Sequence, residues 1–458
     1  MLTKFINEII ALSKLALPVS LAQLAIVGMT ATDVVIAGHA GTVELAGLNL
    51  GTNAWNMVIF FFLGIGFSTQ PLIGNQFGAR NAVGLKHQFH QSIWTCFFSG
   101  IVAMIMVWAV WWAMSLLTFE ANMLAVARSF LLVISLCAIP MVLIPAVRGT
   151  LEGMSLTREV FAVNLAGFLI NIPFDYVLVY GHYGFPKLGG VGCAWATATI
   201  VWLMLLANLF VISRHSKLRD RHLLKNIEGP NWATIISTLK LGVPIGISTT
   251  IELSMFAGAG MLIASFGIVQ ASAHAVAITI ASISFMLYLG IGQGIIIRAS
   301  QFLGAKQEQA AWYTVKAGIS FNVALSSIVM LGFIVYAEQL VLLFSEDNEV
   351  IQVAVVLLYF GAAFQIADCL QLSALSGLRA YQDTTSAPKY QFIAFWILAM
   401  PLGIALAFYD IWPGLEQARG MWLAMLVGLA LTGVLLLLVL KAVAGRSLSA
   451  DTLASTNV

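Results

Sequence analysis

LALPVSLAQLAIVGMTATDVVIA, residues 15–37, is an apolar run in which Asp33 is the one charged side chain. A helix needs about 20 such residues to cross a bilayer. An ionised carboxylate at that depth costs roughly 2.5–3.5 kcal/mol on insertion scales. Glu252 and Asp368 interrupt two further apolar runs in the same way. Acids in such places usually bind or relay a cation, so the sequence predicts cation-driven transport across a membrane.

The composition points to an integral membrane protein. The 458 residues are 60% hydrophobic and 9% charged, whereas soluble domains carry about 25% charged residues. No phosphate-binding loop, HExxH or GxSxG motif or basic nucleic-acid patch occurs in the sequence. We therefore expect neither an enzyme, nor nucleotide-driven transport, nor a nucleic-acid partner. The four cysteines are scattered singly and are interpreted as small core residues.

Twelve apolar runs are long enough to be membrane helices, and the first is expected to be retained rather than cleaved as a signal peptide. They lie near residues 15–37, 52–74, 91–114, 128–147, 160–180, 190–212, 241–265, 274–297, 317–337, 350–374, 390–409 and 420–440. With the N-terminus inside, all 22 basic residues except Arg128, Lys187 and Arg419 fall on the inner side. The positive-inside rule thus predicts twelve helices with both termini in the cytoplasm.

The two halves of the chain resemble each other. Pro18 and Pro244 lie 226 residues apart, and LGIG occurs at both 63–66 and 289–292 with the same offset. The predicted fold is all-α, with two six-helix bundles related by a pseudo-twofold axis and a cleft between them. The expected domains are an N-terminal lobe over 1–212, a cytoplasmic linker over 213–240, a C-terminal lobe over 241–446 and a disordered tail over 447–458.

The acids do not follow the repeat, because Glu252 aligns with Ile26 and Asp33 aligns with Ala259. In the first half, Asp33, Asn171, Asp175 and Thr197 could form one oxygen-rich cluster. Asn171 and Asp175 are four residues apart and share a helix face. Oxygen ligands suit a hard cation such as Na⁺, and a buried carboxyl group suits H⁺ equally well. The alternatives are a structural hydrogen-bond anchor for Asp33 and an interfacial acid for Asp175.

In the second half, Glu252 falls near the middle of one span, and Gln365, Asp368 and Gln371 recur every third residue in another. Such a polar stripe is expected to face a cavity, or else to form a hydrogen-bonded seam between helices. Tyr288 is a neighbour in sequence to this polar set, and lining of a substrate pocket or plain core packing are both open for it.

Several motifs together resemble the multidrug and toxic compound extrusion (MATE) family, and the bacterial NorM-type branch in particular. They are TDVVIAGHAG (32–41), EGMSLT (152–157), NIPFDYVLVYG (171–181), LGGVGCAWAT (188–197), ASAHAVAI (271–278) and GLRAYQDT (377–384). The resemblance covers nearly the whole chain. It implies an antiporter of the bacterial inner membrane that expels cationic, often aromatic drugs in exchange for Na⁺ or H⁺, and thereby confers antibiotic resistance.

The resemblance also implies roles for individual residues. Asp33 matches the acid that carries cation coupling, Glu252 and Asp368 match NorM-type acids, and Asn171 matches a polar family residue. Asp175 departs from the usual NIPLN of that branch and could enlarge the first cation site. The residues expected to hold the coupling cation are Asp33, Asn171, Asp175, Thr197, Glu252 and Asp368, and all of these except Thr197 would be Na⁺ ligands. Substrate contacts are expected from Asp33, Glu252, Asp368, Gln365 and Tyr288.

Three other functions were weighed. A lipid-linked precursor flippase should line its cleft with Arg and Lys, yet no basic residue falls clearly within a predicted span. A membrane-embedded enzyme lacks a convergent catalytic motif, and a passive channel does not explain a bilobed repeat with unequal acids. The prediction is a monomeric antiporter without a cofactor, whose partners are small cationic drugs, Na⁺ or H⁺, and the lipid bilayer.

Overall fold

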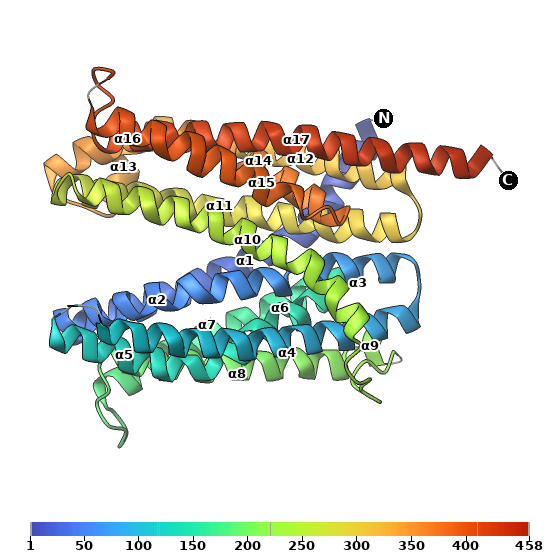
Figure 1. The fold of residues 1–458 in the computed structure, drawn as a ribbon, viewed down its shortest axis with the longest axis horizontal. Helices are drawn as coiled ribbons and strands as arrows, with labels where there is room; N and C mark the ends of the chain where they lie inside the picture. The colour runs from blue at the N-terminus through green and yellow to red at the C-terminus, as the bar shows by residue number, and fades with distance from the viewer. Residues whose placement is uncertain (1, 117, 119, 220, 410, 457–458) are drawn as a thin grey trace. The chain divides into compact units, whose positions relative to one another are not determined.

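The computed structural model describes residues 2–116, 118, 120–219, 221–409 and 411–456 (Figure 1). Within these residues, twelve helices or helix pairs are long and apolar enough to cross a membrane. The prediction of an all-α integral membrane fold with twelve spans is therefore confirmed. The helices are α1 Leu2–Ala40, α2 Thr42–Gly66, α3 Thr69–Gly78, α4 Ala82–Ala113, α5 Ala121–Ile134, α6 Ala138–Gly153, α7 Thr157–Tyr180, α8 Gly190–Arg214, α9 Ser216–Arg219, α10 Trp232–Ala264, α11 Ile268–Gly304, α12 Glu308–Val335, α13 Ala337–Leu342, α14 Asn348–Ala380, α15 Ser386–Phe392, α16 Met400–Phe408 and α17 Ala418–Thr456.

Most helices extend beyond the apolar runs that revealed them. Helix α1, for example, begins at Leu2 rather than near residue 15. A membrane helix can continue past the apolar layer because its own hydrogen bonds satisfy the backbone and long charged side chains reach the interface. A π-helical segment, Ile393–Ala399, joins α15 to α16. Pro401 lies two residues after Ala399 and lacks the N–H group that a regular α-helix would use.

The chain forms two compact units. The N-unit comprises Leu21–Gly246, and the C-unit comprises Met1–Ser20 together with Ile247–Val458. Both boundaries fall inside a long helix, two residues after Pro18 in α1 and two residues after Pro244 in α10. The first part of each helix thus belongs to the unit that is built mainly from the other half of the sequence. This exchange differs from the predicted lobes over 1–212 and 241–446.

The contacts of α1 give the physical reason for its division. Glu8 accepts two hydrogen bonds of 2.7 Å from the guanidinium of Arg298 in α11, and a third from Thr314 of α12 at 2.7 Å. Gly290 of α11 lies so close to Ser20 that a Cβ atom there would approach the Ser20 Oγ to 2.0 Å. The first part of α1 is therefore packed and ion-paired inside the C-unit.

The first part of α10 packs inside the N-unit through an equivalent close contact between two helices. A Cβ on Gly64 of α2 would lie 2.4 Å from the Cα of Gly246, and one on Gly246 would lie 2.4 Å from the carbonyl oxygen of Phe61. Gly64 and Gly290 come from the two LGIG segments, and Gly246 and Ser20 are also 226 residues apart. The repeated sequence positions thus form the same kind of close helix contact once in each unit. Small residues permit such contacts between membrane helices.

The linker and the tail differ from the predictions as well. Helix α8 runs to Arg214, α9 covers Ser216–Arg219 and α10 begins at Trp232, so much of the predicted linker is helical. Helix α17 continues to Thr456, where a disordered tail was expected from residue 447. In α17 the charged and small polar residues after Lys441 do not interrupt the backbone hydrogen bonding of the helix.

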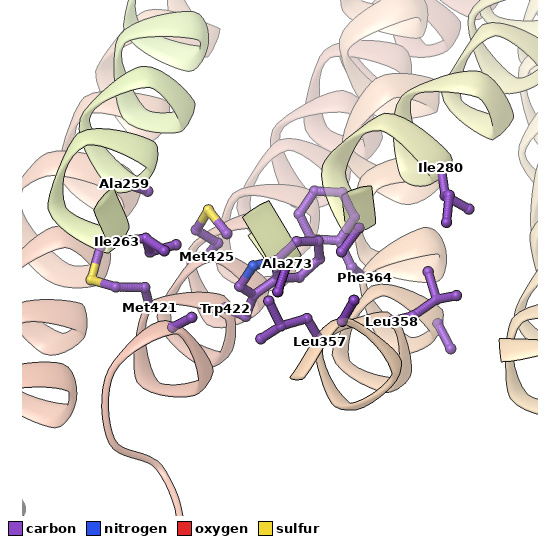
Figure 2. Close-up of a cluster of buried hydrophobic side chains, with 14 of the residues drawn as sticks. Ala259, Ile263, Ala273, Ile280, Leu357, Leu358, Phe364, Met421, Trp422 and Met425 are labelled. Atoms are coloured by element: carbon purple, nitrogen blue, oxygen red, sulfur yellow. The ribbon is translucent and has the colours of Figure 1, made fainter. Parts of the chain in front are cut away.

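Each unit has an apolar core, and Figure 2 shows part of the core of the C-unit. Trp422 of α17 is fully buried there, and its ring lies 6.0 Å from that of Phe364. The Trp422 N–H donates to the Nδ1 atom of His274 at 3.1 Å. The buried indole is thereby satisfied, and His274 serves as its acceptor at the beginning of α11.

Candidate functional site

The N-unit brings Asp33, Asp175 and Cys193 together from α1, α7 and α8. One carboxylate oxygen of each acid and the Cys193 sulfur all lie within 4.8 Å of one another. Thr197 donates a hydrogen bond of 3.2 Å to Asp33 Oδ2. Asn171 lies beside both carboxyl groups. The structure thus gathers all four residues that were predicted to form the first cluster.

Helical spacing explains why these side chains converge. Asn171 and Asp175 are one turn apart on α7, and Cys193 and Thr197 are one turn apart on α8. Tyr180, near the end of α7, donates to the carbonyl of Ile36 in α1 at 3.0 Å. The Cys193 thiol donates to the backbone carbonyl of Asp33 at 3.7 Å. These contacts fix α1 against α7 and α8 at the level of the two acids.

Several polar atoms of the cluster are buried without a hydrogen-bond partner among the residues that the structure describes. They are Oδ1 of Asp33, both carboxylate oxygens of Asp175 and both amide atoms of Asn171. Asp175 and Asn171 are both fully buried. Buried polar groups are rarely left unsatisfied, and two carboxylates at this distance repel each other unless a proton or cation lies with them. The arrangement suits a hard cation or a shared proton.

Cys193 was not expected at this site, because it was interpreted as a small core residue. Its position four residues before Thr197 would have placed it on the same helix face. A single cysteine predicts neither a disulfide nor a zinc site, so the sequence pattern gave no sign that Cys193 belongs to a cation site. In the structure Cys193 is buried and closes one side of the acid pair.

The C-unit holds a second polar cluster around Glu252 of α10. Gln391 donates to Glu252 Oε2 at 3.2 Å and in turn accepts a short hydrogen bond from Ser248. The side chain of Gln371 lies beside the Glu252 carboxylate. Glu252 attracts the charge of Arg379 and repels that of Asp368. The structure therefore brings Glu252, Asp368 and Gln371 together.

Gln365 of α14 and Tyr288 of α11 lie near this cluster. Ser284 of α11 donates to Gln365 Oε1 at 3.0 Å. Tyr288 is fully buried near Ser284 and Asp368, and its hydroxyl has no hydrogen-bond partner among the described residues. Direct contact of Tyr288 or Gln365 with a substrate stays a prediction, as do the ligand roles of the other site residues.

The two clusters differ in charge. Within the described part of the N-unit, no Lys or Arg pairs with Asp33 or Asp175. In the C-unit, Arg379 offsets the charge of Glu252. The Asp33 and Asp175 pair therefore has no basic partner among the described residues, whereas Glu252 has one.

The expectation that no basic residue lies within a span is wrong, because the spanning helices are longer than predicted. Arg148 and Arg298, like Arg379, lie inside spanning helices. Arg148 pairs with Glu152 at 2.5 Å, and Arg298 pairs with Glu8 at 2.7 Å. Both guanidinium groups are neutralised by an acid of the same unit.

A polytopic helical chain with a duplicated plan and acids inside its spanning helices defines a membrane transporter. The family profile described as MatE matches residues 18–177 and 244–405, two segments that begin 226 residues apart. This chain belongs to the MatE family of membrane transporters.

Solved structures share its fold. The eukaryotic MATE transporter AtDTX14 is 18% identical, with coverage of 98% of this chain and 99% of that chain and a TM-score of 0.86. A multidrug resistance MATE transporter of the MOP superfamily in an outward-facing conformation is 16% identical, with 96% of each chain covered and a TM-score of 0.85. A MOP superfamily transporter from Pyrococcus furiosus, described as having a binding pocket of reverse polarity, is 15% identical, with 95% and 96% covered and a TM-score of 0.83.

Proposed function

We propose that this chain is a cation-coupled antiporter that exports cationic and aromatic drugs and other toxic compounds, in exchange for Na⁺ or H⁺. The observation that carries the proposal is the pair Asp33 and Asp175, which lies inside spanning helices without a basic partner in the described residues. Such a pair binds a cation or a proton more readily than it stays doubly charged. This pair of acids is therefore the proposed binding site of the coupling ion.

Coupling requires that the ion bind one conformation of the transporter better than the other. Asp33 lies on the helix that the two units share, since α1 passes from the C-unit to the N-unit near Ser20. A cation held by Asp33, Asp175 and Asn171 would bridge the second part of α1 to α7. Binding or release at this site would change how firmly that part of α1 is attached to the N-unit.

The C-unit cluster is assigned to the substrate. Arg379 is the basic partner of Glu252, whereas Asp368 meets only the charge of Glu252, so the cluster keeps an uncompensated negative charge that an organic cation can balance. One helical turn from these acids, the rings of Phe256 and Phe364 lie 5.9 Å apart. Aromatic faces bind organic cations and flat aromatic rings, so this pair supports a substrate of that chemistry.

The pairing of the intramembrane arginines weighs against a flippase for anionic lipid-linked precursors. Arg148 and Arg298 are engaged by Glu152 and Glu8, and Arg379 interacts with Glu252. Such a substrate would have to displace acids that already neutralise these side chains. The location proposed for the antiporter is the bacterial inner membrane, with both termini cytoplasmic according to the basic residues, and the functional form is a monomer.

The test uses purified protein in liposomes loaded with a fluorescent cationic dye. An inward Na⁺ gradient and an inward H⁺ gradient are imposed separately, and movement of the dye is recorded. The proposal expects one gradient to drive dye movement in the wild-type protein and not in Asp33→Asn. If neither gradient moves the dye, antiport of organic cations is wrong, and flipping of a labelled lipid precursor becomes the assay.

A further inference from the structure

The segment between α8 and α10 is held along one face of α4. His87, His90, Gln91 and Trp94 of α4 all contact it, and Gln88 donates to Thr238 in the first turns of α10. These positions follow the one-turn spacing of a helix face. The segment and α4 both belong to the N-unit, so the attachment lies within one compact body.

Most of these bonds go to the backbone of the segment. His90 is buried; its Nε2 donates to the carbonyl of Leu223 at 2.6 Å, and its Nδ1 accepts from the N–H of Glu228 at 3.2 Å. Gln91 accepts from the N–H of Asn231 at 2.7 Å and donates to the carbonyl of Gly229 at 3.0 Å. Trp94 donates to the carbonyl of Glu228 at 2.9 Å. The path of the backbone is thereby fixed by side chains of α4.

The conformation of the segment is also unusual for its residues. His222 and Asn226 have positive φ values of 47° and 50°, in the left-handed region that residues with side chains rarely adopt. Conformations of this kind persist where the surrounding structure determines them. The α4 contacts supply that constraint, and the turns at His222 and Asn226 present Leu224, Lys225 and Ile227 to the outside.

The side chains presented outward are apolar and basic. Ile227 is 66% exposed and Trp232 is 60% exposed, although neither lies in the middle of a spanning helix. The Trp232 ring stacks on Phe98 at 5.5 Å, and Phe98 stacks on Trp94 at 5.7 Å. Tryptophan rings of this kind are enriched at membrane–water interfaces. The exposed apolar and aromatic side chains of this segment are therefore of the kind found where a bilayer meets water.

The charge of the segment is strongly positive. Residues 214–232 contain five basic residues, Arg214, Lys217, Arg219, Arg221 and Lys225, and two acidic residues, Asp220 and Glu228. Glu228 is engaged by His87 at 2.5 Å. Arg214, Lys217 and Lys225 have exposed side chains. Basic and apolar side chains on one interfacial element attract anionic lipids, at about 1 kcal/mol for each basic residue near the surface.

We propose that residues 214–219 and 221–232 form an interfacial binding site for anionic phospholipid of the cytoplasmic leaflet. Leu224, Ile227 and Trp232 contact the acyl boundary, and Arg214, Lys217 and Lys225 bind the phosphate groups. The hydrogen bonds from α4 hold the site in shape before lipid binds. The assignment to the cytoplasmic leaflet rests on the proposed orientation of the chain, and it does not depend on drug or ion transport.

The test uses the full-length protein with Ile227→Cys labelled by an environment-sensitive fluorophore and reconstituted in phosphatidylcholine liposomes. Brominated phosphatidylglycerol or brominated phosphatidylcholine is added at equal mole fraction, and quenching of the label is compared. We expect stronger quenching by the anionic lipid, and a preference that declines with salt. About 1 kcal/mol for a basic residue corresponds to about a 5-fold change in partitioning, so neutralising several should abolish the preference.

Three variants make the result specific. Arg214→Gln/Lys217→Gln/Lys225→Gln should lose the preference, whereas Lys316→Gln/Lys441→Gln/Arg446→Gln in the C-unit removes the same charge and should keep it. His90→Leu retains every basic residue but removes both backbone bonds, and should reduce the preference. Equal quenching by both lipids, or equal loss in the two triple variants, would overturn the proposal. Absence of quenching by either lipid would show that the segment lies away from the bilayer and would also refute it.

Discussion

Asp33 and Asp175 bring carboxylate oxygens within 4.8 Å of each other, although they come from α1 and α7 and are far apart in sequence. The Cys193 sulfur lies within the same distance, and Thr197 donates to Asp33 from the next turn of α8. Four side chains thus surround one small polar volume. The chemistry of these ligands decides which ion can bind there.

Asp33→Asn and Asp175→Asn should each weaken binding of the coupling cation by at least about 10-fold, which corresponds to about 1.4 kcal/mol. Each substitution preserves shape and removes one of the two negative charges. The measurement is the cation-dependent rise in melting temperature of the purified protein, in Na⁺ against K⁺ and over a range of pH. Undiminished cation dependence in both variants would place the ion elsewhere.

Cys193→Ala tests whether the Cys193 sulfur is a ligand of the bound ion. Thiolates select soft metals, whereas Na⁺ is bound by oxygen, and a proton at this site would be shared by the two carboxylates. We therefore expect Cys193→Ala to change the cation dependence by less than about 3-fold, much less than either acid substitution. A loss as large as that of Asp175→Asn would instead indicate that the sulfur is a ligand, and would contradict the assignment of a hard cation.

Arg379→Gln should destabilise the protein by about 1–3 kcal/mol, because it leaves Glu252 without its basic partner. Glu252→Gln in the same chain should restore most of the lost stability, since it removes the unbalanced charge. Thermal unfolding of the two single variants and the double variant measures the coupling. Additive effects would show that Arg379 acts independently of Glu252.

Gly64→Ala should destabilise the N-unit by about 1–3 kcal/mol. The added methyl group would lie 2.4 Å from the Cα of Gly246, where backbone rather than a flexible side chain must move. Gly332→Ala is the matched control, because no atom lies within 4 Å of that position among the described residues, and alanine is the better helix former. Equal melting temperatures for Gly64→Ala and Gly332→Ala would refute the close contact between α2 and α10.

The ion pair of Glu8 and Arg298 should contribute about 1–3 kcal/mol of coupling in a double-mutant cycle with Glu8→Gln and Arg298→Gln. Its two hydrogen bonds are 2.7 Å long, and both side chains are largely buried. The pair of Glu159 and His215, at 3.2 Å and more exposed overall, is the comparison and should contribute less than about 1 kcal/mol. Equal coupling in the two cycles would contradict a special role for Glu8 in holding α1.

Much of the fold followed from the sequence for a physical reason. A bilayer requires apolar helices of about 20 residues. A count of twelve spans places nearly all basic residues on one side of the membrane, as the positive-inside rule requires. The convergence of Asp33, Asn171, Asp175 and Thr197 also followed, because carboxylates inside spanning helices need polar neighbours.

Other features depend on contacts that no local pattern encodes. The division of α1 and α10 between the units results from the packing of Gly64 on Gly246 and of Gly290 on Ser20. Both LGIG segments were visible in the sequence, but their partners were not. Arg379 was missed as a partner of Glu252 because the end of α14 extends beyond its apolar run.

The central claim, that Asp33 and Asp175 bind the ion that drives transport, is tested most directly by gradient-driven dye movement in proteoliposomes. Wild-type protein, Asp33→Asn and Asp175→Asn are compared under an inward Na⁺ gradient and under an inward H⁺ gradient. The account predicts dye movement with one gradient in the wild-type protein and little or none in either variant, with all three proteins folded to the same extent. Full gradient-driven movement in both variants would contradict it.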